Sequence, residues 1–204
     1  MTVLLLDVRW PTMIPMEWVH SLQGPVAFSP EIPVKARWNI NSLLSESGTP
    51  GEVYVAFDED APEVTARIAA GEKVLEVPSR TDAVFKAQQV MERAVALGEW
   101  ERSHNHQTLL PYLREEAEEF AEAVTTGAGD ESIKKELADV FLQVLFHAEI
   151  ASRRGAFSMD DVAQAFIDKL RSRAPYLFDG TTFVVDMETQ DRLWKEGKRA
   201  ELDN

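Results

Sequence analysis

Two pairs of acidic residues constrain this chain more than any other feature of its sequence. Glu116 and Glu119 are three residues apart, and Glu136 and Asp139 repeat that spacing after sixteen intervening residues. Both pairs lie in long segments with helical periodicity, and this spacing places each pair on one face of its helix. The fold must therefore accommodate carboxylates on helix surfaces that are otherwise apolar.

The first of these helices carries its acids beside an apolar arc. At about 100° per residue, Glu116 falls inside the arc and Glu119 at its edge. Glu115 lies a little further round, whereas Glu118 and Glu122 point toward solvent. The arc itself consists of Leu109, Tyr112, Leu113, Phe120, Ala123 and Val124.

The second helix has apolar residues on both sides of a polar strip. We therefore expect its middle to be nearly enclosed. The strip consists of Glu136, Asp139, Gln143 and His147. Taken alone, His147 is more typical of a hydrogen-bonded histidine at the edge of a core than of a metal ligand.

An antiparallel hairpin of the two helices would bring all four acids together. An unpaired buried charge costs on the order of several kcal/mol, so such a cluster must be protonated, paired with Lys or Arg, or neutralised by a metal. Oxygen ligands favour Mg²⁺, with Mn²⁺ as a substitute. The alternative is a solvated acidic face without a metal. A di-iron site is disfavoured, because neither Glu116 nor Glu136 has a histidine three residues later.

The rest of the chain divides near residue 80. Residues 3–8, 53–57 and 73–77 are short runs typical of strands, and residues 63–70 fit a crossover helix. Residues 1–80 are therefore predicted to form a small α/β domain. Residues 81–204 are predicted to form a helical bundle of about five helices. Their expected ranges are 82–97, 108–126, 131–153, 158–174 and 189–201.

Several of these helices have recognisable end signals. Asp82 is a candidate cap for the first helix, Thr108 for the second and Asp130 for the third. Ser158 and Asp161 are spaced as a capping box for the fourth. The predicted fold class is mainly α, with a compact helical bundle after a small α/β domain.

Charge and composition exclude several functional classes. The net charge of −14 opposes non-specific binding to nucleic acid or to an anionic membrane. The absence of cysteine excludes thiol catalysis, disulfides and cysteine-ligated metal centres. The apolar runs are short and lack signal-peptide features, so we expect a cytoplasmic protein without a membrane segment.

The acidic motif and its surroundings resemble the MazG family of nucleoside triphosphate pyrophosphohydrolases. The segments LREEAEEFAEAV and KKELADVFLQVLFHAEIA resemble the family's EExxE and ExxD motifs. Further similar segments, in the family's order, are WERSHNHQTLLPYL, KLRSRAPYLF and RLWKEGK. The family commonly has Gly where this chain has Ala138 and Thr where it has Asn105, which affects packing and base selectivity. Residues 1–80 contain no nucleotide-binding loop of the Rossmann or Walker type and are left without an assigned role.

This resemblance implies an all-α homodimer or higher oligomer that uses Mg²⁺ to hydrolyse NTP or dNTP to the monophosphate and pyrophosphate, often in nucleotide-pool house-cleaning. It implies metal ligation by Glu116, Glu119, Glu136 and Asp139, with Glu115 and Glu119 as catalytic carboxylates, either of which could activate the attacking water. The residues that it implies near substrate are Trp100, Lys169, Arg173, Trp194 and Lys198. Without the resemblance, Lys169 and Arg173 fit ordinary surface charges, and Trp194 fits packing against the bundle.

Two alternatives remain open at the level of sequence. The first is a non-catalytic MazG-like interaction or regulatory protein whose acidic helices bind a basic partner. The second is a related pyrophosphohydrolase specific for one substrate, such as phosphoribosyl-ATP or one pyrimidine dNTP. The second alternative shares the metal chemistry and differs only in the pocket.

Overall fold

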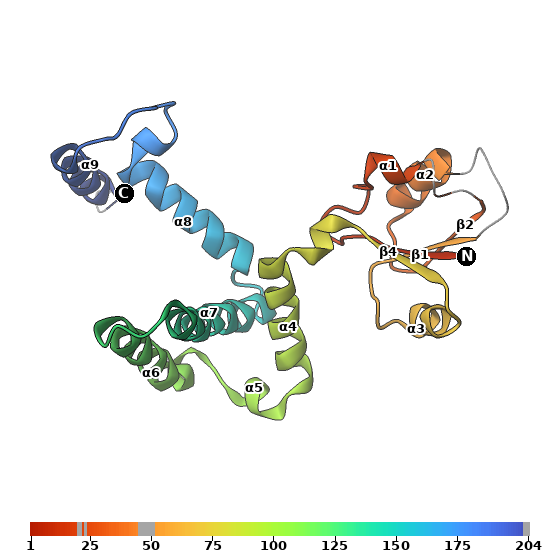
Figure 1. The fold of residues 1–204 in the computed structure, drawn as a ribbon, viewed down its shortest axis with the longest axis horizontal. Helices are drawn as coiled ribbons and strands as arrows, with labels where there is room; N and C mark the ends of the chain where they lie inside the picture. Colours follow the sequence, from red (N-terminus) through yellow and green to blue (C-terminus); the bar gives the residue numbers. More distant parts are fainter. Residues whose placement is uncertain (20–21, 23, 45–51, 202–204) are drawn as a thin grey trace. The chain divides into compact units, whose positions relative to one another are not determined.

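The chain contains two compact units, each with its own secondary structure. The computed structural model describes residues 1–19, 22, 24–44 and 52–201. The first unit comprises Met1–Ala87 and the second Gln88–Asn204. Figure 1 shows the strands in the first unit and the long helices in the second. The predicted fold class, a helical domain preceded by a small α/β part, is confirmed.

The first unit is built on a parallel four-stranded sheet. Its strands are β1 (Thr2–Leu5), β2 (Val26–Phe28), β3 (Val53–Ala56) and β4 (Lys73–Glu76), in the spatial order β2-β3-β1-β4. The central strand β1 pairs with β3 in the register Thr2 to Val53, and with β4 in the register Thr2 to Lys73. A parallel sheet of this kind needs helices on both faces, because both are apolar.

The helices of the first unit provide that cover. The short α1 (Met16–Val19) and α2 (Val34–Leu44) lie on one side of the strands, and α3 (Pro62–Ala69) lies on the other (Figure 1). On the α2 side, Ile40 packs with Leu4 and Val55. On the α3 side, Val64 packs with Val3 and Leu5. Alternate residues of β1 therefore point into two separate cores.

The sequence analysis did not predict α1, β2 or α2 in this unit. Residues 26–28 form the edge strand β2, and residues 34–44 form α2, between prolines at 25, 30, 33 and 50. Residue 50 itself is outside the described part of the chain. Pro33 directly precedes α2, where a proline is tolerated because the first helical N–H groups need no intrahelical acceptor. The prolines at 25, 30 and 33 lie outside β2 and α2, so they do not interrupt either element.

The second unit is helical throughout its described part. Its elements are α4 (Ala83–Leu97), which begins in the first unit, α5 (Glu99–Ser103), α6 (His106–Thr125), α7 (Asp130–Arg153), α8 (Met159–Arg173) and α9 (Met187–Ala200). A short 3₁₀ helix, η2 (Pro175–Leu177), follows α8. Helices α6 and α7 form an antiparallel hairpin, and Gly127 in the connection has a φ of +68°. That left-handed conformation favours glycine.

The predicted helix caps had mixed outcomes. Asp82 does cap α4, and its Oδ1 accepts a hydrogen bond of 2.7 Å from the backbone N–H of Phe85. Ser158 and Asp161 form the predicted capping box. The assignment of Thr108 was wrong: Asn105 is the N-cap of α6, and Thr108 completes its capping box from within the helix. Asp130 was also assigned wrongly, since it is the first helical residue after the N-cap Gly129. At this position its negative charge interacts favourably with the helix dipole.

Helices α8 and α9 pack closely because α9 has a glycine at the contact. Gly197 is buried, and a Cβ built on it would lie 2.5 Å from the carbonyl oxygen of Ser172 and 2.9 Å from the Cα of Arg173. Both atoms belong to the backbone of α8, so a rotamer change cannot relieve the clash. The approach of the two helices therefore depends on the absence of a side chain.

We expect Gly197→Ala to destabilise the α8–α9 pair by about 1–3 kcal/mol, despite the better helix propensity of alanine. The measurement is hydrogen exchange of α9 amides together with thermal unfolding. Arg199→Ala, an exposed position on the same helix, is the matched control and should leave both unchanged. Equal stability of the alanine variant at 197 and the wild type would contradict this packing.

Many large apolar side chains of the second unit are exposed. In α7, which was expected to be nearly enclosed, Leu137 is 53% and Leu142 42% exposed. That expectation is wrong for the single chain, because α6 covers only one side of α7. Exposed side chains also occur on α8 and beyond it, including Phe166, Phe183 and Val184. Apolar surface of this extent indicates an interaction surface.

Among the described residues, no helix combines the length and the apolar character that crossing a bilayer requires.

Candidate metal and nucleotide site

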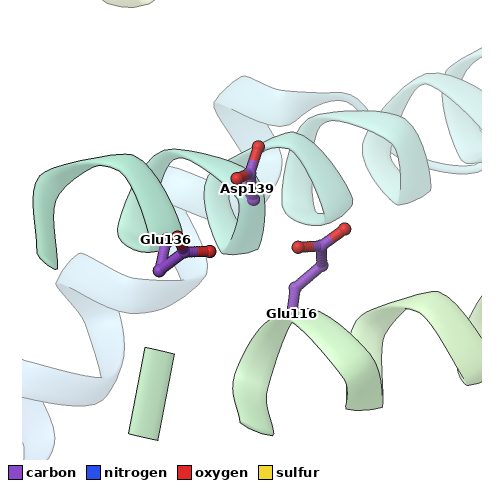
Figure 2. A group of neighbouring side chains, drawn as sticks. All are labelled: Glu116, Glu136 and Asp139. Atoms are coloured by element: carbon purple, nitrogen blue, oxygen red, sulfur yellow. The ribbon is translucent and has the colours of Figure 1, made fainter. Parts of the chain in front are cut away.

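Three carboxylates from the α6–α7 hairpin converge on one point. Glu116 comes from α6, and Glu136 and Asp139 come from α7; each offers an oxygen, and these oxygens lie within 4.8 Å of one another. Figure 2 shows Glu116 extending from its helix toward Asp139, with Glu136 beside Asp139 on the facing helix. The i, i+3 spacing on α7 and the antiparallel arrangement of the helices together produce this convergence.

One carboxylate of the group has an unsatisfied oxygen. Glu136 Oε1 accepts a hydrogen bond of 3.1 Å from Lys135 Nζ, which also lies 3.8 Å from Asp139 Oδ2. Glu136 Oε2 is buried and has no hydrogen-bond partner among the described residues. A buried carboxylate oxygen without a partner is unfavourable. The charge of Lys135 therefore offsets only part of the negative charge of the three carboxylates.

Burial and neighbouring acids raise the pKa values of Glu116 and Glu119. Loss of hydration on partial burial raises the pKa of Glu116, and the charges of Asp139 and Glu119 raise it further. Loss of hydration, followed by the charge of Glu136, likewise raises the pKa of Glu119. The hydrogen bond and charge of Glu136 raise the pKa of Lys135. Acids that repel one another in this way are those that a cation would stabilise.

The structure brings together three of the four predicted metal ligands. Glu119 lies outside the group of three, although it is close enough for the charge of Glu136 to affect it. Glu115 is exposed on the same helix, and its charge contributes to the raised pKa of both Glu116 and Glu119. These two acids flank the group.

The donor set fits a hard divalent cation. All the converging atoms are carboxylate oxygens, which suit Mg²⁺ and Mn²⁺ better than zinc or copper. The orphaned oxygen of Glu136 and the raised pKa of Glu116 both indicate an arrangement that a cation would complete. Three protein oxygens leave further coordination positions for water and phosphate.

Trp100, predicted to lie near substrate, is on α5 and belongs to an aromatic cluster that includes residues of the α6–α7 hairpin. Its ring centroid is 4.2 Å from that of His104, 5.7 Å from Tyr112 and 6.1 Å from Phe146. Trp100 is 52% exposed, whereas Phe146 on α7 is buried. The exposed face of Trp100 could therefore stack on a planar ligand.

The other four predicted substrate residues are on α8 and α9. Lys169 and Arg173 lie on the last turns of α8, and Trp194 and Lys198 lie on α9. In Figure 1, α9 and the end of α8 lie apart from α6 and α7. The single chain therefore does not bring these residues together with the acidic group.

Arg173 is already paired within the chain. Its Nε lies 3.0 Å and its Nη2 2.5 Å from the carboxylate oxygens of Glu201, and its guanidinium lies 5.2 Å from the centre of the Trp194 ring. The hydrogen bond and charge of Glu201 raise the pKa of Arg173. Arg173 and Trp194 thus form one small basic and aromatic group with a carboxylate in the place that an anion would take.

Sequence reasoning missed several members of the site region. Lys135 was not identified as the partner of Glu136 and Asp139, although its position next to Glu136 was visible. His106 was also missed, and its Nδ1 lies 2.8 Å from Nδ1 of His147. This hydrogen bond agrees with the prediction that His147 is a hydrogen-bonded histidine. No sequence signal linked His106 to His147, because they are 41 residues apart.

Comparison with known proteins identifies both parts of the chain. Residues 1–75 match the MazG N-terminal domain, and residues 104–178 match the MazG nucleotide pyrophosphohydrolase domain. The chain belongs to the MazG family. The first match also gives a family assignment to the segment that sequence reasoning left unassigned.

Two curated members of the MazG family illustrate the extent of the similarity. The nucleoside triphosphate pyrophosphohydrolase of Mycobacterium tuberculosis is 35% identical, and the protein of the same name from Mycolicibacterium smegmatis is 36% identical. Each alignment covers 98% of this chain, but only 62% and 63% of the respective relatives. The similarity therefore includes both units, while the relatives extend beyond the aligned region.

A solved structure of a MazG-related protein from Thermotoga maritima is similar to the helical part. It is 27% identical, with a TM-score of 0.50, and the match covers 56% of this chain and 97% of that one. The likeness supports the MazG-like helical fold.

Proposed function

We propose that this chain hydrolyses nucleoside triphosphates to the monophosphate and pyrophosphate in a reaction that depends on Mg²⁺, with Mn²⁺ as a substitute. The observation that carries the proposal is the convergence of Glu116, Glu136 and Asp139, with one buried oxygen unsatisfied. The names of the two mycobacterial relatives, both nucleoside triphosphate pyrophosphohydrolases, support the same reaction class. A role in removing aberrant nucleotides is the biological setting that we propose.

The three carboxylates would hold the cation through their converging oxygens. When bound, the ion would offset charge on the phosphates and favour ionisation of a water molecule. Glu119 or Glu115, beside the group, would accept the proton of the attacking water on a carboxylate oxygen. The raised pKa of Glu119 suits it to accept a proton near neutral pH better than an ordinary carboxylate would.

The basic and aromatic residues of α8 and α9 would bind the nucleotide. Three cations there are suited to phosphate oxygens: Lys169, Arg173 and Lys198. The guanidinium of Arg173 can form a bidentate hydrogen bond with a phosphate. Trp194 and Trp100 each have an exposed ring face for a base. Arg173 would have to exchange Glu201 for the phosphate.

We propose that a second copy of the chain completes the site, in a homodimer or higher oligomer. Within one chain, α9 lies apart from the acidic group (Figure 1), although the proposed reaction needs both. The exposed apolar surface of α7 and α8 supports an association that would also bring the two groups together.

Mixing two inactive variants tests this shared site. Asp139→Asn should remove the acidic half and Arg173→Ala the basic half. After the two are denatured and refolded together, we expect about a quarter of the wild-type activity, because half of the dimers would be mixed and have one intact site of two. No recovery, with mixed dimers shown by mass spectrometry, would place each complete site within one chain.

A substrate panel tests the reaction itself. The protein is incubated with each NTP and dNTP plus Mg²⁺, and monophosphate and pyrophosphate are measured with and without EDTA. We expect EDTA to abolish equimolar formation of both products. The absence of metal-dependent product from every nucleotide would favour the alternative of a MazG-like binding or regulatory protein, and turnover of a single nucleotide would indicate a specific pyrophosphohydrolase.

A further inference from the structure

A chain of hydrogen bonds joins the first residue of α6 to the middle and the end of α7. The Nδ1 atoms of His106 and His147 are 2.8 Å apart, and the two rings are nearly parallel, at an interplanar angle of 7°. On its other side, His106 Nε2 lies 3.0 Å from Nη2 of Arg154, the C-cap of α7. Three side chains are therefore connected in series.

The arginine determines which ring nitrogens carry hydrogen. A guanidinium only donates hydrogen bonds, so His106 Nε2 must accept from Arg154, and His106 in its neutral form carries its hydrogen on Nδ1. That hydrogen is donated to His147 Nδ1. Burial lowers the pKa of His147, and a positive charge on His106 would lower it further, so His147 is neutral near pH 7. His147 therefore carries its own hydrogen on Nε2.

The series ends at a donor that has no acceptor. His147 Nε2 is buried and has no hydrogen-bond partner among the residues that the structure describes. One turn earlier on the same face of α7, Gln143 Oε1 is a buried acceptor that also has no partner in the described chain. The Gln143 residue is only 4% exposed. An unsatisfied donor and an unsatisfied acceptor thus lie on neighbouring turns.

These two groups follow the proposed metal ligands along one strip of α7. Gln143 is one turn and His147 two turns beyond Asp139, which corresponds to about 6 Å and 12 Å along the helix axis. A nucleotide whose phosphates were bound at the acidic group would reach these groups if its sugar extended toward the C-terminal end of α7. Buried polar atoms that remain unpaired in the free protein are suited to bind a ligand atom of matching character.

We propose that Gln143 and His147 bind a hydroxyl group of the nucleotide's sugar, an inference that rests on the proposed function. A hydroxyl can accept from His147 Nε2–H and donate to Gln143 Oε1 through a single oxygen. A phosphate oxygen has no hydrogen to give Gln143, and the shielding of both atoms from solvent favours a small group over the edge of a base. His106 and Arg154 act as positioning residues that maintain the tautomer of His147.

Binding of nucleotides that differ only in the sugar tests the proposal. Dissociation constants are measured by calorimetry with Ca²⁺ for ATP, 2′-deoxy-ATP, 3′-deoxy-ATP and 2′,3′-dideoxy-ATP. We expect the dideoxy compound to bind the wild type about tenfold more weakly than ATP. The two monodeoxy compounds identify which hydroxyl is bound. In Gln143→Leu and in His147→Phe, the dissociation constants of dideoxy-ATP and ATP should become nearly equal, so that their ratio falls to about one.

The outcomes separate this inference from the proposed reaction. Equal binding of ATP and dideoxy-ATP by the wild type, or an unchanged ratio in both variants, would overturn the inference and leave the two atoms to a buried water. Nucleotide hydrolysis without sugar discrimination overturns only the inference. Sugar discrimination in binding without hydrolysis supports the inference and overturns only the proposed reaction.

The tautomer series has a readout that needs no ligand. In ¹⁵N-labelled protein at pH 8, we expect the NMR shifts of neutral His106 to show hydrogen on Nδ1, the minor tautomer of an unconstrained histidine side chain. Arg154→Met should allow His106 to adopt the Nε2–H form. It should also reduce the ratio of the dissociation constants of dideoxy-ATP and ATP. Arg153→Met, which removes the neighbouring arginine paired with Glu149, is the matched control and should change neither. Wild-type His106 with hydrogen on Nε2 would overturn the series.

Discussion

Replacing Asp139 with asparagine is expected to reduce pyrophosphate release by more than about 100-fold, with far-UV helicity unchanged. Asp139 and Glu136 supply the α7 half of the acidic group, and Glu116 supplies the α6 half. Asparagine keeps the shape of the side chain but removes the negative charge that would hold the cation. The folded hairpin should tolerate the change, because Asp139 is only partly buried and makes a long ion pair of 3.8 Å with Lys135.

The matched control for this variant is Glu118→Gln. Glu118 lies on α6 among the same acids but is exposed and outside the converging group. The Glu118→Gln variant should keep nearly full activity. This control separates the specific role of Asp139 from the general loss of one negative charge. If Asp139→Asn released pyrophosphate as fast as Glu118→Gln does, the acidic group would not be the catalytic centre.

The second large effect concerns stability. Saturating Mg²⁺ or Mn²⁺ is expected to raise the melting temperature of the helical unit by at least about 5 °C, since binding at 100 times Kd adds about 2.7 kcal/mol. Glu116→Gln should abolish this rise. It should also raise the melting temperature of the metal-free protein at neutral pH, because it removes one charge from a group of mutually repelling acids.

The repulsion among the acids also predicts the direction in which the stability of the metal-free protein changes with pH. Partial burial and the charge of Asp139 raise the pKa of Glu116, so the folded state binds its proton more tightly than the unfolded state. Stability from this group is therefore full below the ordinary carboxyl pKa and is lost as pH rises through the raised pKa. Glu116→Gln should flatten that fall, whereas Glu118→Gln should not. Unfolding curves recorded in EDTA between pH 4 and 8 measure both, and equal slopes for the two variants would contradict the repulsion.

The sequence predicted the long elements well because their periodicity and end signals agree. Residues 131–153 were expected as one helix, and α7 extends over Asp130–Arg153. The errors occurred where two signals competed. Thr108 and Asn105 are both good caps, and only the geometry of the turn decides that Asn105 is outside the helix while Thr108 bonds back to it. In the first unit, β2 is only three residues long and was too short to show a period.

The candidate site could be predicted in part from sequence because i, i+3 acids report a helix face directly. Glu116, Glu136 and Asp139 meet because the acidic faces of α6 and α7 are turned toward each other by the short connection between the two helices. The exclusion of Glu119 from the group depends on the rotation of α6, which periodicity does not resolve to within one residue. The proposed assembly of Lys169 or Lys198 with the acids would depend on packing between two copies of the chain, for which the sequence offers no local signal.

The ion pair between Arg173 and Glu201 affects which anions can reach this arginine. Any incoming anion must displace a tethered carboxylate that is always present at high local concentration. The pair is partly exposed, so breaking it costs on the order of 1 kcal/mol. A monovalent anion would gain little from the exchange, whereas a polyphosphate brings several charges and more acceptor oxygens. If Arg173 binds the substrate as proposed, the ion pair with Glu201 would favour multiply charged ligands over chloride and small carboxylates.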